Sequence, residues 1–350
     1  MFGLGAGSLP TPNLLLPPVA RGVLVPGAMR RDQATLRAGD RISAYQIEGQ
    51  LGAGGMGWVF RAKHQLDGHV VALKVLRDDQ LAVDRAIDRM MREAAILASI
   101  HHDGVPRFYE CGVLPDGRPW IAMELVEGTP LTETIQRGTM SPDAVIDLVD
   151  SVAGVLAAAH DRGVTHRDLK PDNVFLTPSS TYPVRVIDWG IAHHLAGTRY
   201  TDINEAIGTP TYMAPEQARG GSPNGTCDVY GLGVVAYHAL AGRPPFVGGS
   251  AIEILVQHLN RPVPPLAPRC PHAPIGLVEL IERMLAKSTD ARPTAFDVRA
   301  ATQQMKTSTS SNSGPTVSFY IDGVPAQIID EQTGATTSLR APNLAKTGHG

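Results

Sequence analysis

Short apolar runs separated by glycine-containing turns dominate the chain between residues 40 and 126. Their β-branched and aromatic side chains, and their short length, are typical of strands. The triplets Leu66-Asp67-Gly68 and Pro115-Asp116-Gly117 have the composition of tight turns, so neighbouring runs should pair antiparallel. The pattern therefore predicts five antiparallel strands, at residues 45–51, 57–63, 69–76, 108–114 and 118–125.

Helical spacing occurs once among these strands and dominates the chain beyond them. Ile87, Met90, Ala94 and Leu97 recur every three or four residues and predict an amphipathic helix over residues 83–100. This helix and the five strands make up a small lobe.

The stretch from residue 126 to about residue 305 predicts a larger, mostly helical lobe. Ser141-Pro142-Asp143 offers an N-cap, a proline at the first helical position and an acidic first turn, so a helix should begin there. Residues 226–240 are apolar nearly all round, which predicts a buried central helix. The fold class is therefore α+β. Two short strands are expected, at residues 174–176 and 184–187.

The two ends of the chain differ from the middle in composition. Residues 1–39 are rich in Gly and Pro without a sustained period, so we expect a disordered leader. Ser and Thr fill residues 307–313, which predicts a flexible linker, and residues 316–329 could form a hairpin or be disordered. We therefore divide the chain into a leader (1–39), a two-lobed domain (40–305, with lobes at 40–125 and 126–305) and a tail (306–350).

Composition excludes several classes of protein. A formal net charge of -3 argues against a nucleic-acid partner, which usually requires a basic face. Cys111, Cys227 and Cys270 are far apart and form no CxxC pair, so we interpret them as ordinary thiols in a reducing compartment. The longest apolar run, residues 230–241, is too short to span a membrane, and the N-terminal stretch lacks a basic region before its leucines. We expect a cytoplasmic protein.

The most informative stretch is His166-Arg167-Asp168-Leu169-Lys170-Pro171-Asp172-Asn173, which is followed by Asp188-Trp189-Gly190. Phosphoryl transfer needs such a set of groups: a base for the attacking hydroxyl, a cation near the migrating phosphoryl group, and oxygen ligands for magnesium. A chance HRD triplet means little, but the two motifs at this separation support each other.

A glycine-rich turn, Gly52-Ala53-Gly54-Gly55-Met56-Gly57, lies between the first two predicted strands. Its GxGxxG spacing also occurs in dinucleotide-binding folds, but there a helix follows the glycines. Here Trp58-Val59-Phe60 continues as a strand. A hairpin without Cβ atoms can bring backbone N–H groups close to phosphates.

Together these motifs resemble the serine/threonine protein kinases, and in particular the bacterial members of that family, over residues 40–305. The resemblance implies a bilobal protein kinase fold, with ATP as substrate and Mg²⁺, or Mn²⁺ as an alternative, as the metal. Lys74 would hold the α- and β-phosphates, and Glu93 would position Lys74. The ATP-binding residues that the resemblance implies are Leu51, Gly52, Ala53, Gly54, Gly55, Met56, Gly57, Val59, Ala72, Lys74, Glu93, Met123, Glu124, Val126 and Phe175.

The resemblance also implies catalytic roles. Asp168 would be the catalytic base, and Lys170 would neutralise charge on the γ-phosphoryl group. Asn173 and Asp188 would hold the metal through oxygen atoms. Thr209, in Gly208-Thr209-Pro210, would contact the base and the lysine.

Residues 190–216 would form the activation loop of such an enzyme. Arg167 precedes the base directly, and an arginine there commonly binds a phosphate on this loop. Thr201 is the first candidate phosphosite by position and Thr198 the second. The alternative is a loop held by its own contacts.

Three acidic or basic residues have implied structural roles. Glu216 would pair with Arg292 as a buried ion pair. Asp228 would brace the backbone of the catalytic loop, or act as an acid at a helix N-terminus.

One residue departs from the family pattern, because Trp189 stands where phenylalanine is usual. Its indole N–H needs a partner when buried, and we expect an altered inactive conformation rather than lost chemistry. Two other functions compete with an active protein kinase: a nucleotide-gated scaffold and a phosphotransferase acting on small molecules. Protein substrates are the implied partners, and family analogy suggests a homodimer through the small lobe.

Overall fold

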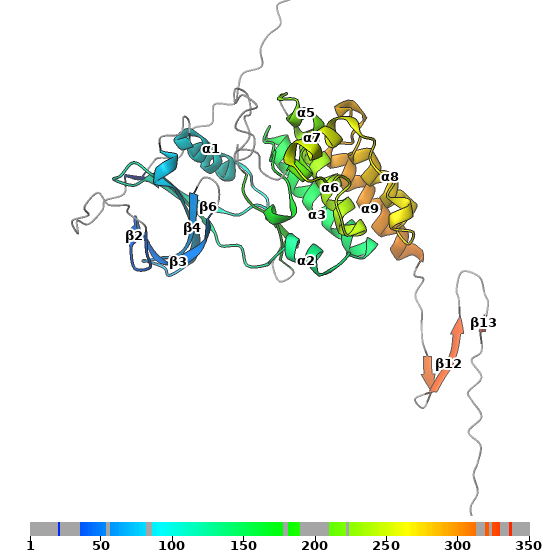
Figure 1. Cartoon of the computed structure of the whole chain (residues 1–350). Helices are drawn as coiled ribbons and strands as arrows, with labels where there is room; N and C mark the ends of the chain where they lie inside the picture. Colours follow the sequence, from blue (N-terminus) through cyan, green and yellow to red (C-terminus); the bar gives the residue numbers. More distant parts are fainter. Residues whose placement is uncertain are drawn as a thin grey trace, which may run out of the picture.

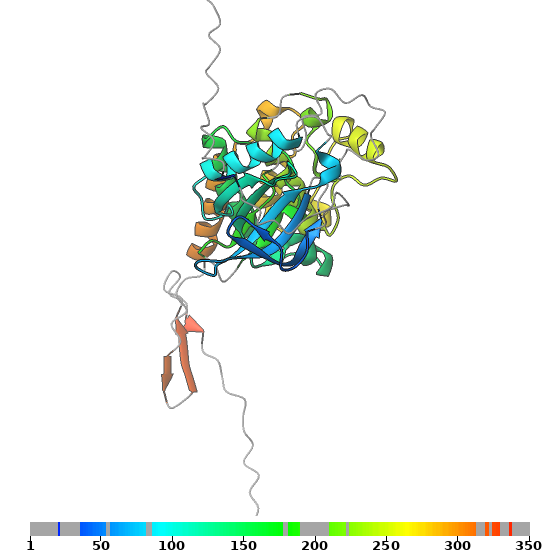
Figure 2. The same cartoon turned by 90° about the vertical axis from the view of Figure 1, so that its left-hand side faces the viewer.

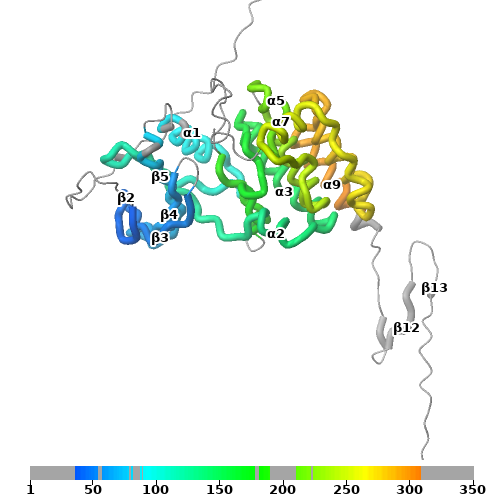
Figure 3. The backbone as a smooth tube through the Cα atoms, viewed as in Figure 1, coloured from blue at the N-terminus to red at the C-terminus, as the bar shows by residue number. Residues whose placement is uncertain are grey.

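The computed structural model describes residues 20–21, 36–53, 57–81, 86–177, 181–189, 210–221, 224–312, 319–321, 324–329 and 336–337. Figure 1 shows strands and one long helix in a small lobe, and mainly helices in a larger lobe. The colours of Figure 3 run from blue and cyan in the small lobe to green, yellow and orange in the large lobe, so each lobe is one continuous stretch of chain. The α+β, two-lobed architecture expected from the sequence is confirmed.

The small lobe is built on a sheet in which the five predicted strands pair antiparallel, in the order β6-β7-β5-β4-β3. Two strands of two residues extend its edges: β2 (Arg41–Ile42) pairs with β3, and β1 (Ala20–Arg21) runs parallel to β6. The expected count of five is therefore corrected to seven, since so short a strand shows no periodicity in sequence. The five main strands are β3 (Tyr45–Ala53), β4 (Gly57–His64), β5 (Val70–Leu76), β6 (Phe108–Val113) and β7 (Pro119–Glu124).

The alternation of side chains along β5 decides which face carries chemistry. Val71, Leu73 and Val75 are buried in one core cluster on one face of the sheet. Lys74 therefore points to the opposite face, where helix α1 (Ala86–Ser99) packs through Met90. Figure 2 looks onto this lobe and shows the strands in front with α1 beside them.

Helices α3 (Pro142–Asp161) and α6 (Gly225–Ala241) form the centre of the large lobe. Ser141 caps α3 as predicted, because its side chain accepts a hydrogen bond from the N–H of Ala144. Residues along nearly the whole length of α6 are buried, as its apolar sequence predicts. The remaining helices are α2 (Leu131–Arg137), α5 (Pro215–Ala218), α7 (Ala251–Asn260), α8 (Ile275–Met284) and α9 (Ala295–Asn312).

A three-stranded sheet carries the end of the catalytic loop. Strand β9 (Val174–Leu176) pairs antiparallel with both β8 (Thr129–Pro130) and β10 (Val184–Val186). The two short strands predicted from the sequence are thereby confirmed. Because Asp188 follows β10 and Asn173 precedes β9, this pairing brings the ends of the two motifs together.

The last helix corrects one expectation. Helix α9 continues to Asn312, so the linker predicted from residue 307 is wrong for residues 307–312. Lys306 Nζ lies 2.8 Å from a carboxylate oxygen of both Asp147 and Asp150 on α3, and the hydroxyl of Thr307 donates to the carbonyl of Gln304. These contacts offset the low helix propensity of Ser and Thr.

Strands β11 (Phe319–Ile321) and β12 (Val324–Ile329) pair antiparallel, as the possible hairpin requires, and β13 (Thr336–Thr337) adds to β12. Most of the leader lies outside the described residues. Within the described part of the chain, every helix is too short or too polar to cross a bilayer.

We predict that Leu156→Ala lowers the free energy of unfolding by about 2–5 kcal/mol, because it leaves a cavity at the centre of the large lobe, where Leu156 is fully buried. The matched control is Ile275→Ala in the same lobe, where the side chain is 68% exposed and the expected change is within about 0.5 kcal/mol. Urea unfolding followed by circular dichroism measures both. Equal losses in the two variants would contradict the assigned core.

Candidate active site

Three charged side chains from three separate elements meet between the lobes. Lys74 of β5 donates to both carboxylate oxygens of Glu93 on α1, at 2.8 and 2.9 Å. The same ammonium group lies 2.8 Å from Oδ1 of Asp188, which follows β10 in the large lobe. One cation therefore connects the sheet, the helix and the large lobe.

Burial and pairing shift the pKa values of this triad in opposite directions. Burial lowers the pKa of Lys74, but the charges of Glu93 and Asp188 more than offset this, so its pKa lies above its ordinary value. The charge of Lys74 lowers the pKa of Asp188, whose side chain is 54% exposed. For Glu93, burial outweighs the attraction of Lys74 and raises the pKa. The lysine is held as an ammonium ion throughout the neutral range.

The loop that contains Asp168 is compact and internally bonded. Lys170 Nζ lies 2.7 Å from Oδ2 of Asp168, so the sequence motif brings the carboxylate of the predicted base close to the lysine. Asn173 follows in the short 3₁₀ helix η2 (Pro171–Asn173), and its amide nitrogen donates to the carbonyl of Asp168 at 2.8 Å. That bond fixes the orientation of the amide and leaves its oxygen directed elsewhere.

Asp228, near the start of α6, braces the backbone of this loop. Its carboxylate accepts hydrogen bonds from the N–H groups of His166 and Arg167, at 2.8 and 2.7 Å. His160 on α3 also contacts it, at 2.8 Å. Arg167 has φ of 68°, a region that side chains with a Cβ rarely adopt, and the brace holds this strained turn. The bracing role expected for Asp228 is confirmed.

Asp188 also adopts a left-handed backbone conformation, with φ of 60°. The next residue, Trp189, is buried, and its indole nitrogen donates to the carbonyl of Val186 at 2.8 Å. Its ring contacts that of His166 edge-on, at 4.9 Å between centroids. The partner that a buried indole requires is thus present, while the expected effect on an inactive conformation stays a prediction.

Asn173 and Asp188 are suited in position and chemistry to a divalent cation. The N–H of Ile187 donates to the carbonyl of Asn173 at 2.9 Å, which ties the residue before Asp188 to Asn173. An amide oxygen and a carboxylate are the hard donors that such a cation prefers. Oδ1 of Asp188 contacts Lys74, which leaves Oδ2 for a metal.

Strand register brings some of the predicted nucleotide-binding residues beside Lys74 and its neighbours. Val59 is opposite Lys74, Ala72 is opposite Met123, and Gly52 pairs with Val59 across the first hairpin. A Cβ atom at Gly57 would lie 2.5 Å from the carbonyl oxygen of Val75, so this turn residue must be glycine. Leu51 and Ala53 lie on β3, Glu124 ends β7, Val126 follows it, and Phe175 is on β9.

Six predicted site residues lie outside the described part of the chain. They are Gly54, Gly55, Met56, Thr198, Thr201 and Thr209.

Residues 45–305 match the family model of the protein kinase domain. The chain belongs to the protein kinase family. It is 33% identical over 319 residues to the serine/threonine-protein kinase PknA of Mycobacterium tuberculosis, covering 87% of this chain and 73% of that protein. It is 37% identical over 269 residues to the serine/threonine-protein kinase pkn3 of Myxococcus xanthus, covering 74% of this chain and 49% of that protein.

A solved structure supports the same assignment. The crystal structure of the Mycobacterium tuberculosis PknI kinase domain superimposes with a TM-score of 0.60 at 27% sequence identity, covering 77% of this chain and 99% of that domain. The resemblance to bacterial serine/threonine protein kinases is thereby confirmed.

The predicted ion pair of the large lobe of this kinase is present. Arg292 donates to both oxygens of Glu216, at 2.6 and 2.8 Å, and its side chain is fully buried. The same guanidinium donates to the carbonyls of Ala286, Thr226 and Lys287, so its donors are well satisfied. This pair fixes α5, which begins at the end of the stretch expected to form the activation loop, to the core.

His258 on α7 is a buried residue that sequence reasoning missed. Its Nε2 donates to the carbonyl of Thr211 at 2.9 Å, so its Nδ1 must accept the hydroxyl of Tyr230 at 2.8 Å. Burial, and then the charge of Lys287, lower its pKa from 6.5 to about 4. Only the folded chain places these distant residues together, so no local pattern could have indicated them.

We predict that acid weakens the large lobe through His258. The pKa of His258 is lower in the folded than in the unfolded chain. Its contribution to the free energy of unfolding is therefore complete above about pH 6.5 and is lost as the pH falls towards 4. The free energy lost over this range is on the order of 3 kcal/mol for a pKa shift of this size. Urea unfolding at several pH values should show a smaller decrease for His258→Gln than for the wild type. His272→Gln, at an exposed position, should keep the wild-type slope, and equal slopes for all three proteins would refute the assignment.

Proposed function

We propose that this kinase transfers the γ-phosphoryl group of ATP to serine and threonine hydroxyls of protein substrates. The observation that carries the proposal is the contact of Lys74 with both Glu93 and Asp188, beside a loop that presents Asp168 and Lys170. These parts come from opposite lobes, and each has a place in phosphoryl transfer. The named relatives of this chain are serine/threonine-protein kinases.

In this proposal Asp168 orients the acceptor hydroxyl and takes up its proton as the phosphoryl group moves. Lys170, 2.7 Å from the carboxylate, neutralises charge on the migrating group. Thr209 would contact both side chains. The brace from Asp228 keeps the loop rigid, so that the carboxylate does not have to be positioned during the reaction.

ATP would lie beside β3, β4 and β7. Lys74 would hold its α- and β-phosphates, and the glycine-rich turn from Gly52 to Gly57 would cover them. At the hinge, the N–H of Glu124 already donates to the carbonyl of Arg107, at 2.8 Å. Glu124 would therefore offer its carbonyl oxygen to the adenine edge, and Val126 its N–H group.

Asn173 and Asp188 would hold Mg²⁺, or Mn²⁺ as the alternative. A cation there screens the negative charge of the phosphates. The chain's own contribution is to orient the two ligands. Lys74 engages Oδ1 of Asp188, and the carbonyl of Asp168 engages the amide nitrogen of Asn173. The other oxygen of Asp188 and the amide oxygen of Asn173 would then be left for the metal.

Activation by phosphorylation belongs to the same proposal. The Nε atom of Arg167 is buried and has no hydrogen-bond partner among the described residues. A phosphate on Thr201, or second on Thr198, would satisfy this guanidinium and order the loop. We further propose domain limits at residues 40–305, close to the family match, while the homodimer through the small lobe stays a prediction.

The nucleotide-gated scaffold is the competing function, and the geometry favours the enzyme. A scaffold has no need for Asp168 and Lys170 to be in contact on a strained, braced loop. The structure keeps the metal ligand Asp188 beside Lys74 despite the tryptophan that follows it.

We predict that Asp168→Asn lowers the rate of phosphate transfer by about 10²–10⁴-fold, the usual contribution of a general base. The assay measures label incorporation from ATP and Mg²⁺ into the purified chain and a basic protein. Binding of ATP should be unchanged in this variant. The matched control is Asp172→Asn in the same loop, where the side chain is exposed and the rate should stay near that of the wild type. A wild-type chain that binds ATP without transferring phosphate, alone or after loop phosphorylation, would establish the scaffold instead.

We also predict that Thr201→Ala lowers the activity of the autophosphorylated enzyme by about tenfold or more, because one to three charge-assisted hydrogen bonds to Arg167 are lost. Mass spectrometry of the active wild type should find phosphate on Thr201. Thr198→Ala is the matched control and should have a smaller effect. Full activity with an unmodified loop would show that the loop is held by its own contacts.

A further inference from the structure

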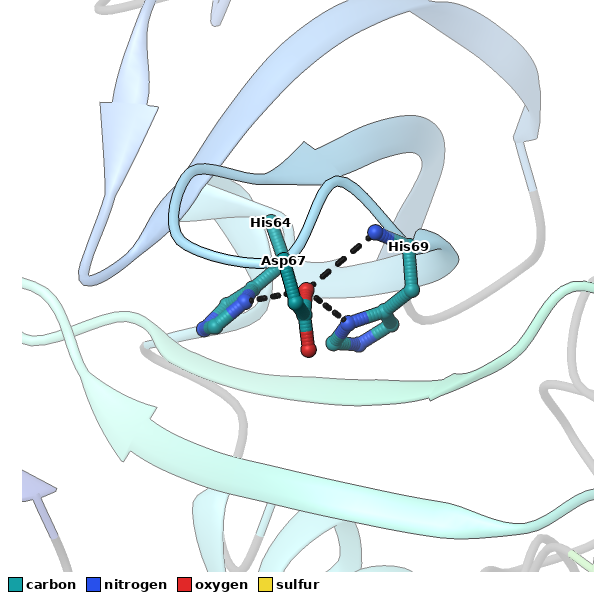
Figure 4. A group of neighbouring side chains, drawn as sticks. All are labelled: His64, Asp67 and His69. Carbon is teal, nitrogen blue, oxygen red and sulfur yellow. Dashed lines mark hydrogen bonds and ion pairs between the residues drawn. The ribbon is translucent and has the colours of Figure 1, made fainter.

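A cluster of two histidines and one aspartate lies at the turn between β4 and β5, outside the kinase site. His64 ends β4, Asp67 lies in the turn, and His69 directly precedes β5. Figure 4 shows the carboxylate of Asp67 between the two imidazole rings, with both rings directed at it. Among the described residues this is a group whose metal-ligating atoms all lie within 4.8 Å of one another.

Both imidazoles contact the same oxygen atom. Nδ1 of His64 lies 2.7 Å from Oδ1 of Asp67, and Nδ1 of His69 lies 2.5 Å from it. The backbone N–H of His69 donates to this oxygen as well, at 3.2 Å. Three hydrogen bonds therefore converge on one oxygen atom of Asp67.

A carboxylate only accepts hydrogen bonds, so both Nδ1 atoms must carry hydrogen in this arrangement. The hydrogens on the two Nδ1 atoms thus lie between these nitrogens and Oδ1 of Asp67. A divalent cation that displaces them would be bound by two imidazole nitrogens and one carboxylate oxygen. This mixed set suits zinc and similar transition metals, whereas magnesium and calcium prefer oxygen ligands alone.

The surroundings hold the two rings in place. The ring centroids of His64 and His69 are 4.7 Å apart, and Tyr109 contacts His69 at 5.0 Å. Nε2 of His69 is buried and has no hydrogen-bond partner among the described residues, so the contact with Asp67 is what orients this ring. Zinc–ligand distances of about 2.0–2.2 Å place tetrahedral ligand atoms about 3.4 Å apart, so each imidazole nitrogen would move away from Oδ1 of Asp67 by less than about 1 Å.

The group of converging ligand atoms consists of His64, Asp67 and His69 alone among the described residues, and the ring of Tyr45 lies 5.1 Å from that of His64. The three side chains would leave one coordination position open to water.

We propose that His64, Asp67 and His69 form a binding site for one zinc ion or a chemically similar divalent transition metal. The site lies at the opposite end of β4 from Gly57, at a distance of roughly 25 Å for an eight-residue strand. The ion would join the end of β4 to the start of β5, the strand that carries Lys74. It is separate from the Asn173–Asp188 pair in both place and ligand type.

The test is isothermal titration calorimetry, in which ZnCl₂ is added to the full chain without an affinity tag. The buffer contains excess Mg²⁺, which occupies sites made of oxygen ligands. We expect one zinc ion per chain, with affinity at least about 10–100-fold weaker in both His64→Gln and His69→Gln, since losing even an outer-shell partner costs this much. The ion should also raise the midpoint of thermal unfolding in the wild type and not in these variants. Without zinc, all the proteins should have equal circular dichroism spectra and equal kinase activity.

The control is His272→Gln, because His272 follows Cys270 by two residues, and an imidazole and a thiolate so close in sequence are a competing pair of zinc ligands. Unchanged zinc binding in this variant, with loss in His64→Gln and His69→Gln, supports the proposal. Absence of stoichiometric binding by the wild type overturns it, as does loss of the ion in His272→Gln with retention in the other two. Visible absorption of the Co²⁺-substituted protein adds a second readout, because thiolate charge-transfer bands would place the ion at cysteine and overturn the proposal.

Discussion

The position of the Lys74 ammonium group between two carboxylates is the constraint on which the active site of this kinase depends. Removing a cation from water costs several kcal/mol, and only close opposite charges offset this. Glu93 and Asp188 provide these charges at 2.8 Å, from α1 in one lobe and from the segment after β10 in the other. The interaction therefore stabilises a particular placement of α1 on the sheet and of Asp188 opposite it. A nucleotide that engages Lys74 and a metal that engages Asp188 would replace the contact between them.

The large lobe positions the proposed catalytic groups through hydrogen bonds to backbone rather than through apolar packing alone. Asp228 receives two N–H groups of the loop, and Gln217 donates to the carbonyl of Arg167 at 2.7 Å. These contacts offset the strain of the left-handed backbone conformation of Arg167. They also link α5 and α6 to the loop that contains Asp168. Glu216 and Arg292 then anchor α5 itself. The catalytic loop is thus held by hydrogen bonds from α5 and from α6, and α6 is itself buried along most of its length.

The two ends of β4 serve different chemistry. Gly57 begins the strand beside the turn expected to cover phosphates, and its lack of a Cβ atom is required by the carbonyl of Val75. His64 ends the strand in the cluster with Asp67 and His69. Antiparallel pairing with β5 connects both ends to the strand that carries Lys74. An ion at the cluster would therefore act on the stability of this hairpin without occupying the space of the nucleotide.

The sequence by itself determined the main elements and located the motifs from which the catalytic residues are proposed. Apolar spacing identified the five long strands and α1, and the cap at Ser141 identified the start of α3, because these signals are local. The motifs around Asp168 and Asp188 were readable for the same reason, since their spacing along the chain carries the chemistry.

Tertiary structure decided the remainder. Four features depend on partners distant in sequence. They are the two-residue strands β1 and β2, the continuation of α9 past Lys306, the hydrogen bonds of His258, and the contact of His160 with Asp228. The cluster at the β4–β5 turn is local, yet its spacing matched no metal motif, and only the fold directed both imidazoles at one oxygen. A pattern along the chain specifies which residues share a face, whereas the distance between polar atoms is fixed only when the elements pack.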